Sequence, residues 1–260
     1  MEPRVVKSIQ EFIEEKREKK QIVNAVIRDD VFSVLDNECN VLYYSLDDEI
    51  EGCHILKPVK GKMEQFVFIN TSKVVQEQVW TAAHELGHVW NVDQYVKEKN
   101  VGCVENCEKI VGRFAAEFLM PAHIFDREVG NKLSELQFSG SQMSQQTMVE
   151  LVTHLMNFFC TPYKSVILRF VELGYVSSDD EEKYLEGFEQ NLSMYQRLIK
   201  ENQYTRLEEK KVVYAIGNIQ KELDYLEKRG VLKKSYVQRV RELFHINESV
   251  TVGDDLEFKV

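Results

Sequence analysis

The chain has 260 residues, of which 43% are hydrophobic and 29% charged, and its formal net charge at pH 7 is −10. This length is enough for a real core and for more than one domain. The acidic balance argues against the chain as a whole binding nucleic acid. No apolar run approaches the length of a membrane span, and no signal-peptide core follows Met1, so we expect a cytoplasmic protein that does not bind membranes.

The first seventy residues contain a helix pattern followed by strand patterns. Residues 4–20 place apolar side chains on one face, which is typical of an amphipathic helix. Short runs rich in Val, Ile, Phe and Tyr then predict four strands, at Val31–Leu35, Val41–Tyr44, Cys53–Leu56 and Gln65–Ile69. Turn residues at Asp36-Asn37 and Lys60-Gly61-Lys62 separate them, and the pattern favours a small, largely antiparallel sheet.

A helix pattern without Gly or Pro follows the last strand and runs from Val74 into the pentapeptide His84-Glu85-Leu86-Gly87-His88. We expect Thr71 or Ser72 to be its N-cap. Residues four apart lie on the same helix face, so both histidines can direct a ring nitrogen at one metal ion. Glu85 can then reach a water on that ion, where a general base must be. The competing interpretation is a solvated histidine pair on an amphipathic helix.

A site of this kind needs a third protein ligand and leaves a fourth position for water. Glu117 is the candidate, because it is a single carboxylate within the apolar stretch Arg113–Pro121. A glutamate in such surroundings is costly to bury unless a partner compensates its charge, and a divalent cation would do so. The alternative for Glu117 is the outer face of an amphipathic helix.

Two blocks of sequence resemble the ImmA/IrrE family of metallopeptidases. They are Thr81–His88, which contains the pentapeptide, and Phe114–Pro121, which Glu108 precedes. The second block departs from the usual family pattern at Phe118, where Leu is common, and at Gly112, where Asn is common. The resemblance implies a gluzincin-like metallopeptidase core in which the last strand leads directly into the motif helix.

The mechanism expected from these residues is metal-dependent peptide hydrolysis. His84, His88 and Glu117 would bind Zn²⁺, although this donor set also accepts Mn²⁺, and no other cofactor is expected. Glu85 would take a proton from water and pass it to the leaving amine. A further donor should stabilise the oxyanion. The candidates are His123, Tyr95 and Tyr163, each of which could equally be a core or surface residue.

The five cysteines, at positions 39, 53, 103, 107 and 160, are odd in number and scattered, which does not indicate a disulfide framework. Cys103 and Cys107 would face each other across one helical turn. A structural metal site would need two more nearby ligands, and the sequence offers none. We therefore expect free thiols.

Residues 141–176 predict two short helices separated by a break at Cys160–Pro162, with Gly174 ending the second. This helix-turn-helix-like unit resembles the segment that often follows the peptidase core in the family. Lys164 and Arg169 are nearly its only cations, whereas phosphate binding needs several. We expect a packing or substrate-recognition role and no direct binding of nucleic acid.

Residues 180–250 are rich in charge and carry two apolar stripes of helical spacing. One stripe runs from Tyr184 to Ile199 and the other from Val212 to Leu226, with Gly230 ending the second helix and a third beginning at Ser235. The pattern favours a solvated helical bundle over a specific nucleic-acid surface.

The sequence thus predicts an α+β fold in three parts: a metallopeptidase core (1–140), the helix-turn-helix-like unit (141–178) and a C-terminal charged helical domain (179–260). The family resemblance implies an anti-repressor protease that cleaves a helix-turn-helix repressor of a mobile element, phage or stress response in bacteria. The rival is a non-catalytic, metal-stabilised protein that sequesters such a partner. A DNA-binding regulator with a decayed peptidase core is disfavoured. The oligomeric state is left open.

Overall fold

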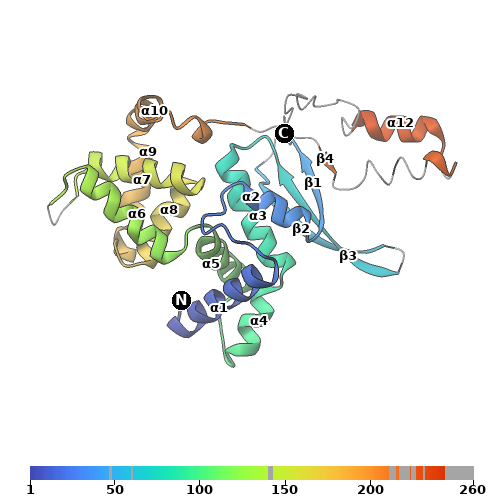
Figure 1. The fold of residues 1–260 in the computed structure, drawn as a ribbon, viewed down its shortest axis with the longest axis horizontal. Coiled ribbons are helices and arrows are strands. Elements are labelled where there is room, and N and C mark those ends of the chain that lie inside the picture. Colours follow the sequence, from blue (N-terminus) through green and yellow to red (C-terminus); the bar gives the residue numbers. More distant parts are fainter. Residues whose placement is uncertain are drawn as a thin grey trace, which may run out of the picture.

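The computed structural model describes residues 1–46, 49–59, 61–139, 143–210, 215–216, 223, 227–230 and 232–243. The described chain has an α+β architecture in which a small sheet lies on one side of a central group of helices and a second helical group lies on the other (Figure 1). The first helices and strands are α1 (Pro3–Lys19), α2 (Asp30–Asp36), β1 (Asn40–Tyr44), β2 (Gly52–Val59), β3 (Lys62–Asn70), α3 (Val75–Val89), α4 (Val92–Lys99) and α5 (Cys107–Leu119). The later ones are α6 (Ala122–Glu135), α7 (Gln145–Phe159), α8 (Tyr163–Glu172), α9 (Glu181–Glu189), α10 (Leu192–Glu201), β4 (Ala215–Ile216) and α12 (Lys234–Leu243).

The sheet has the strand order β2-β3-β1-β4 within the described residues. β2 and β3 form an antiparallel hairpin whose turn contains Gly61, a residue with φ of +80° that suits glycine. β1 runs parallel to β3, because the chain passes from β1 to the outer strand β2 and then returns through the hairpin as β3, which lies between them. The sheet is therefore mixed, with antiparallel pairs on both sides of one parallel pair.

Three of the four predicted strands are confirmed as β1, β2 and β3, but the prediction for Val31–Leu35 is wrong. These residues lie in helix α2, where Val31 and Leu35 are fully buried one turn apart. A short apolar run fits a buried strand or one face of a helix equally well, so periodicity alone did not decide between them. The tertiary packing of both residues into the core decides for the helix.

The helix that carries the pentapeptide begins one residue later than its sequence pattern predicted, and its cap differs. Val74 is the N-cap of α3, and its side chain makes no capping hydrogen bond, so the expectation of Thr71 or Ser72 is wrong. The turn between β3 and α3 is instead held by buried Asn70, whose side chain accepts hydrogen bonds from the backbone N–H groups of Leu46 and Ser72, both at 3.0 Å. The entry into the motif helix is thus fixed by the end of the sheet.

Helices α1, α3 and α5 pack around a cluster of aromatic rings. The Phe114 ring lies 6.1 Å from Phe12, 5.9 Å from Trp90 and 5.4 Å from Phe118, measured between ring centroids. Burying large aromatic side chains stabilises a fold through their area, and their edge contacts add to it. The predicted amphipathic helix at 4–20 is confirmed as α1, whose apolar face contributes Phe12 to this cluster.

Helices α6 to α10 form the second helical group (Figure 1). The turn between α7 and α8 passes through Cys160, which has φ of +55°, and Pro162 then precedes the first turn of α8. Gly174, with φ of +80°, follows the end of α8. Two helices joined at this point agree with the sequence pattern, while a helix-turn-helix role for them stays a prediction.

The C-terminal region departs from the expected bundle. The apolar stripe from Tyr184 to Ile199 is divided between α9 and α10 by a break at residues 190–191. Ala215–Ile216, within the second stripe, form strand β4 and pair with β1, so this segment is not one continuous helix. Most of the remaining stripe lies outside the described residues. The third predicted helix is present as α12.

The three-part division of the chain stays a prediction. One hydrophobic cluster extends from α1 to Leu207, and it therefore crosses the expected boundaries near residues 140 and 178. Leu198 and Ile199 of α10 belong to the same cluster, and the side-chain amide of Gln76 donates to the Leu207 carbonyl. None of the helices in the described ranges is long and apolar enough to cross a membrane.

Candidate metal centre

The pentapeptide lies in the last two turns of α3, and the first turn of α5 packs against it. Gly87 permits this close approach, because a Cβ at that position would lie 2.9 Å from both Phe114 Cδ1 and Val111 Cγ1. A larger residue would separate the two helices. The small residue within the motif therefore serves the contact between the two helices and not the helix that contains it.

Glu108 of α5 faces both histidines of α3. Its Oε2 lies 3.1 Å from His84 Nε2 and its Oε1 lies 3.5 Å from His88 Nε2. The two imidazole rings are 5.1 Å apart between centroids. One ligand atom from each of the three residues lies within 4.8 Å of the other two, and no other such group of His, Cys, Asp or Glu occurs in the part of the chain that the structure describes.

The cluster is accessible from solvent on the Glu108 side. The His84 and His88 side chains are 23% and 19% exposed, whereas the Glu108 side chain is 68% exposed. Asn106 caps α5 by accepting a hydrogen bond of 2.8 Å from the backbone N–H of Lys109, which fixes the turn that presents Glu108. The positive end of the helix also favours a carboxylate in this first turn.

The three donors fit a divalent metal ion. Burial, followed by the neighbouring His88, lowers the pKa of His84, which keeps its imidazole neutral and one ring nitrogen free to bind. Two imidazoles and a carboxylate are a donor set that zinc takes in hydrolytic sites. Among described residues no lysine or arginine pairs with Glu108, so its charge is left for a cation.

Glu85 lies beside the cluster in a buried position. Burial raises its pKa to about 7, and the charge of Glu108 adds to the rise. The edge strand β2 approaches α3 closely at Gly52. A Cβ at this position would lie 2.4 Å from Thr81 Cγ2 and 2.7 Å from the Phe68 carbonyl oxygen. A carboxyl group with a pKa near neutrality can both accept and release a proton at physiological pH.

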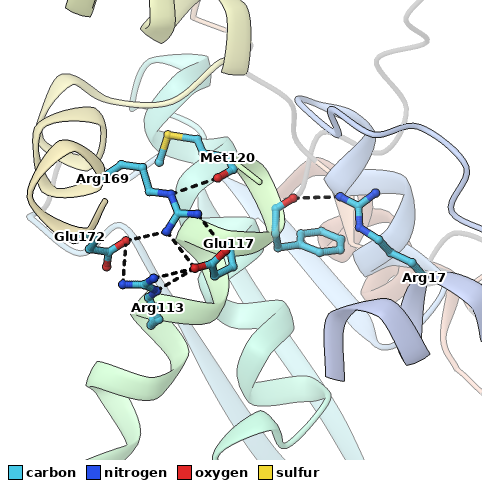
Figure 2. A network of polar contacts seen from close by, with 7 residues as sticks. Arg17, Arg113, Glu117, Met120, Arg169 and Glu172 are labelled. Carbon is cyan, nitrogen blue, oxygen red and sulfur yellow. Dashed lines mark hydrogen bonds and ion pairs between the residues drawn. The ribbon is translucent and has the colours of Figure 1, made fainter. Parts of the chain in front are cut away.

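The structure does not bring Glu117, the third ligand expected from the sequence, to the histidine pair. Arg169 reaches both carboxylate oxygens of Glu117, at 2.9 and 2.8 Å, and Arg113 binds Oε1 at 2.7 Å (Figure 2). Arg169 also donates to the Met120 carbonyl and to Glu172. Burial would raise the pKa of Glu117, but Arg169 and Arg113 outweigh it and hold that pKa below its usual value. Glu117 is buried and needs a partner, as its surroundings predicted, but arginines supply it.

Helix geometry explains why Glu108 and Glu117 cannot share one site. They lie nine residues apart on α5, which places them about 13.5 Å apart along the axis and on opposite faces. Glu108 faces α3, whereas Glu117 faces Arg169 of α8. The prediction from the sequence used burial as the criterion for a ligand, and burial selected the end of α5 that faces α8.

Burial of Arg169 removes one of the few cations of the helix-turn-helix-like unit from its surface. The Arg169 side chain is fully buried, so it is not available to a nucleic-acid backbone. Lys164 of α8 remains, and its ammonium group lies over the Tyr163 ring. The folded unit therefore exposes even fewer cations for phosphate contacts than its sequence contains.

The three candidates for oxyanion stabilisation have other surroundings. The Tyr95 ring packs against Phe12 at 4.8 Å between centroids. Tyr163 donates its hydroxyl proton to Glu189 and stacks on Phe188. His123 is exposed at the start of α6. Nothing in these contacts brings any of them to the histidine pair.

The sequence analysis did not place three residues that lie next to the histidine pair. In the sequence, Glu108 is only the residue that precedes the second block. The N-cap Asn106, two residues before it, marks a helix start and could have drawn attention to it. The His54 ring on β2 stacks on His88 at 6.1 Å, and its Nε2 lies 2.9 Å from Gln65 Oε1. Cys107 Sγ lies 3.8 Å from His88 Nδ1. No sequence pattern pairs a strand residue with this helix, so His54 could be found only from the fold.

All five cysteines are free, as the sequence predicted. Cys107 is hydrogen-bonded to Asp93 of α4. Burial and the Asp93 charge raise the pKa of the Cys107 thiol. Cys103, in the loop before α5, is half-buried against the core.

The histidine pair of α3 and Glu108 of α5 form a group of side chains that could hold a metal ion, and the family comparison agrees with a metallopeptidase-like site. Residues 38–139 match the family model described as the IrrE N-terminal-like domain, of peptidase family M78. The resemblance to the ImmA/IrrE metallopeptidases is confirmed for this segment, which supports a metallopeptidase-like function. Comparisons with curated proteins and with solved structures found no match.

Proposed function

We propose that this chain is a zinc-dependent endopeptidase whose metal is held by His84, His88 and Glu108, with Glu85 as the general base. The observation that carries the proposal is the convergence of three donor side chains within 4.8 Å, next to a buried glutamate. Two of these donors and the base come from one helix, and the third comes from the helix packed on it.

The donor set determines which metals suit the site. When bound, a divalent ion supplies Lewis acidity, which polarises a peptide carbonyl and makes water more acidic. The histidines bind through neutral ring nitrogens, and Glu108 compensates one positive charge. Manganese is the alternative, because two imidazoles and one carboxylate do not by themselves select zinc.

Glu85 would move the proton. Its carboxylate accepts one proton from the attacking water, and the resulting carboxyl group donates that proton to the leaving nitrogen as the C–N bond breaks. A pKa raised to about 7 suits both halves of this transfer. Glu85 is buried, and Gly52 lies against it, since a Cβ at Gly52 would be 3.7 Å from Glu85 Oε1.

Strand β2 is suited to hold the substrate. It is at the edge of the described sheet, and its Gly52 and His54 lie next to Glu85 and His88. An extended peptide could pair with such an edge through its main chain. This arrangement requires a substrate segment that is extended or locally unfolded when it is cut.

The substrate that the family resemblance implies is a helix-turn-helix repressor of a mobile element, phage or stress response. A generic metal site carries little selectivity, so specificity must come from surfaces outside it. The α7–α8 helix pair is one such surface, and burial of Arg169 favours a packing or protein-recognition role for this pair over DNA contact. The rival function is sequestration of the same partner without cleavage.

The test uses Glu85→Gln with Glu77→Gln, a change on the same helix away from the cluster, as the matched control. Zinc content is measured by elemental analysis, and cleavage is followed by mass spectrometry on a panel of purified helix-turn-helix repressors that includes any encoded next to this gene. We expect both variants to bind zinc, and only Glu85→Gln to lose cleavage. Undiminished cleavage by Glu85→Gln would exclude the general-base role. Zinc binding with partner binding but no hydrolysis by the unmodified protein would favour sequestration.

A further inference from the structure

The second ring nitrogen of His88 has an unusual neighbour. A histidine that binds a metal through Nε2 must carry its proton on Nδ1, and the acceptor for that proton fixes the tautomer and the ring orientation. In this protein the Cys107 thiol contacts Nδ1, with Sγ at 3.8 Å. A carboxylate or a backbone carbonyl is the usual partner at such a position.

The thiol is itself held by a third residue. Cys107 is hydrogen-bonded to Asp93, which also forms an ion pair of 3.1 Å with Lys97. An ionised carboxylate can only accept hydrogen bonds, so Cys107 donates its S–H to Asp93. The sulfur lone pairs are then left for the His88 Nδ1–H. This order of donors leaves Nε2 without a proton, on the side that faces Glu108.

The three residues belong to three different helices that meet at the cluster. His88 is near the end of α3, Asp93 is in the first turn of α4, and Cys107 is the first residue of α5, next to Glu108. Asn91, with φ of +56°, makes the sharp turn between α3 and α4 that returns Asp93 towards His88. The contacts from Asp93 through Cys107 to His88 therefore connect the end of α3 with the start of α5, where Glu108 lies.

We propose that Asp93 and Cys107 are positioning residues, which hold His88 in the tautomer that binds metal through Nε2. The proposal rests on the proposed metal site, because it assigns a role in organising that site. Neither residue touches the metal or the substrate. Their effect is on the affinity for metal and on the protonation pattern of the His88 ring.

The first experiment measures zinc affinity by competition with a chromophoric chelator. We expect Cys107→Ala and Asp93→Ala each to weaken zinc binding by about 10- to 100-fold, the range typical of outer-sphere partners. Cys103→Ala and Lys97→Met are the controls. Cys103 is a second half-buried thiol with no contact recorded to His88, and Lys97 is the other partner of Asp93, so both should bind zinc like the unmodified protein.

A double-variant cycle tests whether Asp93 acts through the thiol. If it does, Asp93→Ala should have little further effect on zinc affinity in the Cys107→Ala background, so the two effects should not add. Additive effects would show that Asp93 acts independently of Cys107, and they would overturn the proposal that Asp93 acts on His88 through the thiol.

The tautomer is measured without metal, by long-range ¹H–¹⁵N correlation on the zinc-free protein with labelled histidine. We expect His88 to carry its proton on Nδ1 in the unmodified protein and to become a mixture in Cys107→Ala. An unchanged tautomer with unchanged zinc affinity in both single variants overturns the inference. Absence of zinc binding by the unmodified protein is a different result, and it refutes the proposed metal site instead.

Discussion

The two glutamates of α5 provide a direct comparison between an open and a closed carboxylate. Glu108, at the first turn, is 68% exposed and faces two imidazoles. Glu117, in the last turn, is 4% exposed and has both oxygens bound by guanidinium groups. The helix and the residue type are the same, so the difference lies entirely in what the neighbouring helices present.

The comparison shows that a buried carboxylate need not be a metal ligand, because arginines can compensate its charge. A buried carboxylate must be compensated, and an arginine within the fold does this permanently, whereas a metal ligand must keep its charge for an ion that arrives later. Glu117 therefore joins α5 to α8, and Glu108 is left for the cation. Substitutions at the two ends of α5 should therefore affect different properties, namely zinc affinity near Glu108 and stability near Glu117.

The largest effect is expected from Arg169→Met. This change leaves Glu117 buried with Arg113 alone, and removing one partner of a buried ion pair typically costs about 3–5 kcal/mol. We expect the free energy of unfolding, measured by urea denaturation of zinc-free protein, to fall by about that amount. The folded variant should keep its zinc affinity. Arg197→Met, which removes an exposed partner of Glu201, serves as the control and should change stability by less than about 1 kcal/mol.

The next effect distinguishes the two glutamates by metal binding. Glu108→Gln removes a charged ligand, and we expect zinc affinity to fall by more than about 100-fold, beyond the range of outer-sphere partners. Glu117→Gln should keep zinc affinity and lose stability instead. Chelator competition and urea denaturation on both variants provide the comparison. Loss of zinc by folded Glu117→Gln, with zinc retained by Glu108→Gln, would restore the assignment made from the sequence.

A smaller effect is expected where α5 meets α3. In Gly87→Ala the added methyl group meets Phe114 and Val111 at 2.9 Å, and overpacking of this kind costs about 1–3 kcal/mol. The added methyl group should push α5 away from α3, which moves Glu108 away from the histidines and weakens zinc binding. Gly112→Ala on α5 is the matched control, because among the described residues no atom outside the adjoining backbone of α5 lies within 4 Å of its added Cβ. It should be neutral or stabilising by up to about 1 kcal/mol. Equal losses in the two variants would contradict the role of Gly87.

The smallest effect is expected at the cap of α5. Asn106→Ala removes the hydrogen bond to the Lys109 N–H, and such changes typically cost about 1 kcal/mol. Amide hydrogen exchange should become faster in the first turn, near Glu108, and stay unchanged near Glu117. Asn106→Ser should preserve protection, because serine is also a good N-cap. Faster exchange along the whole helix would show that the cap stabilises more than the first turn.

The sequence determined the local features of the site. Residues four apart on a helix share a face in any fold, so the His84–His88 pair and the adjacent Glu85 were found from spacing alone. The alternating and apolar runs of β1, β2 and β3 were sufficient to predict strands. The isolated, odd-numbered cysteines were sufficient to predict free thiols, and the two sequence blocks identified the family of residues 38–139.

Only the tertiary structure decided which groups from different elements meet. Val31–Leu35 is helical because both ends of the run are buried together, and β4 exists because β1 offers it an edge. Glu108 faces the histidines while Glu117 faces Arg169, because two positions nine residues apart on a helix point in opposite directions. Periodicity gives the direction of a side chain relative to its own helix, but the partner on the other side depends on packing between segments that are distant in sequence.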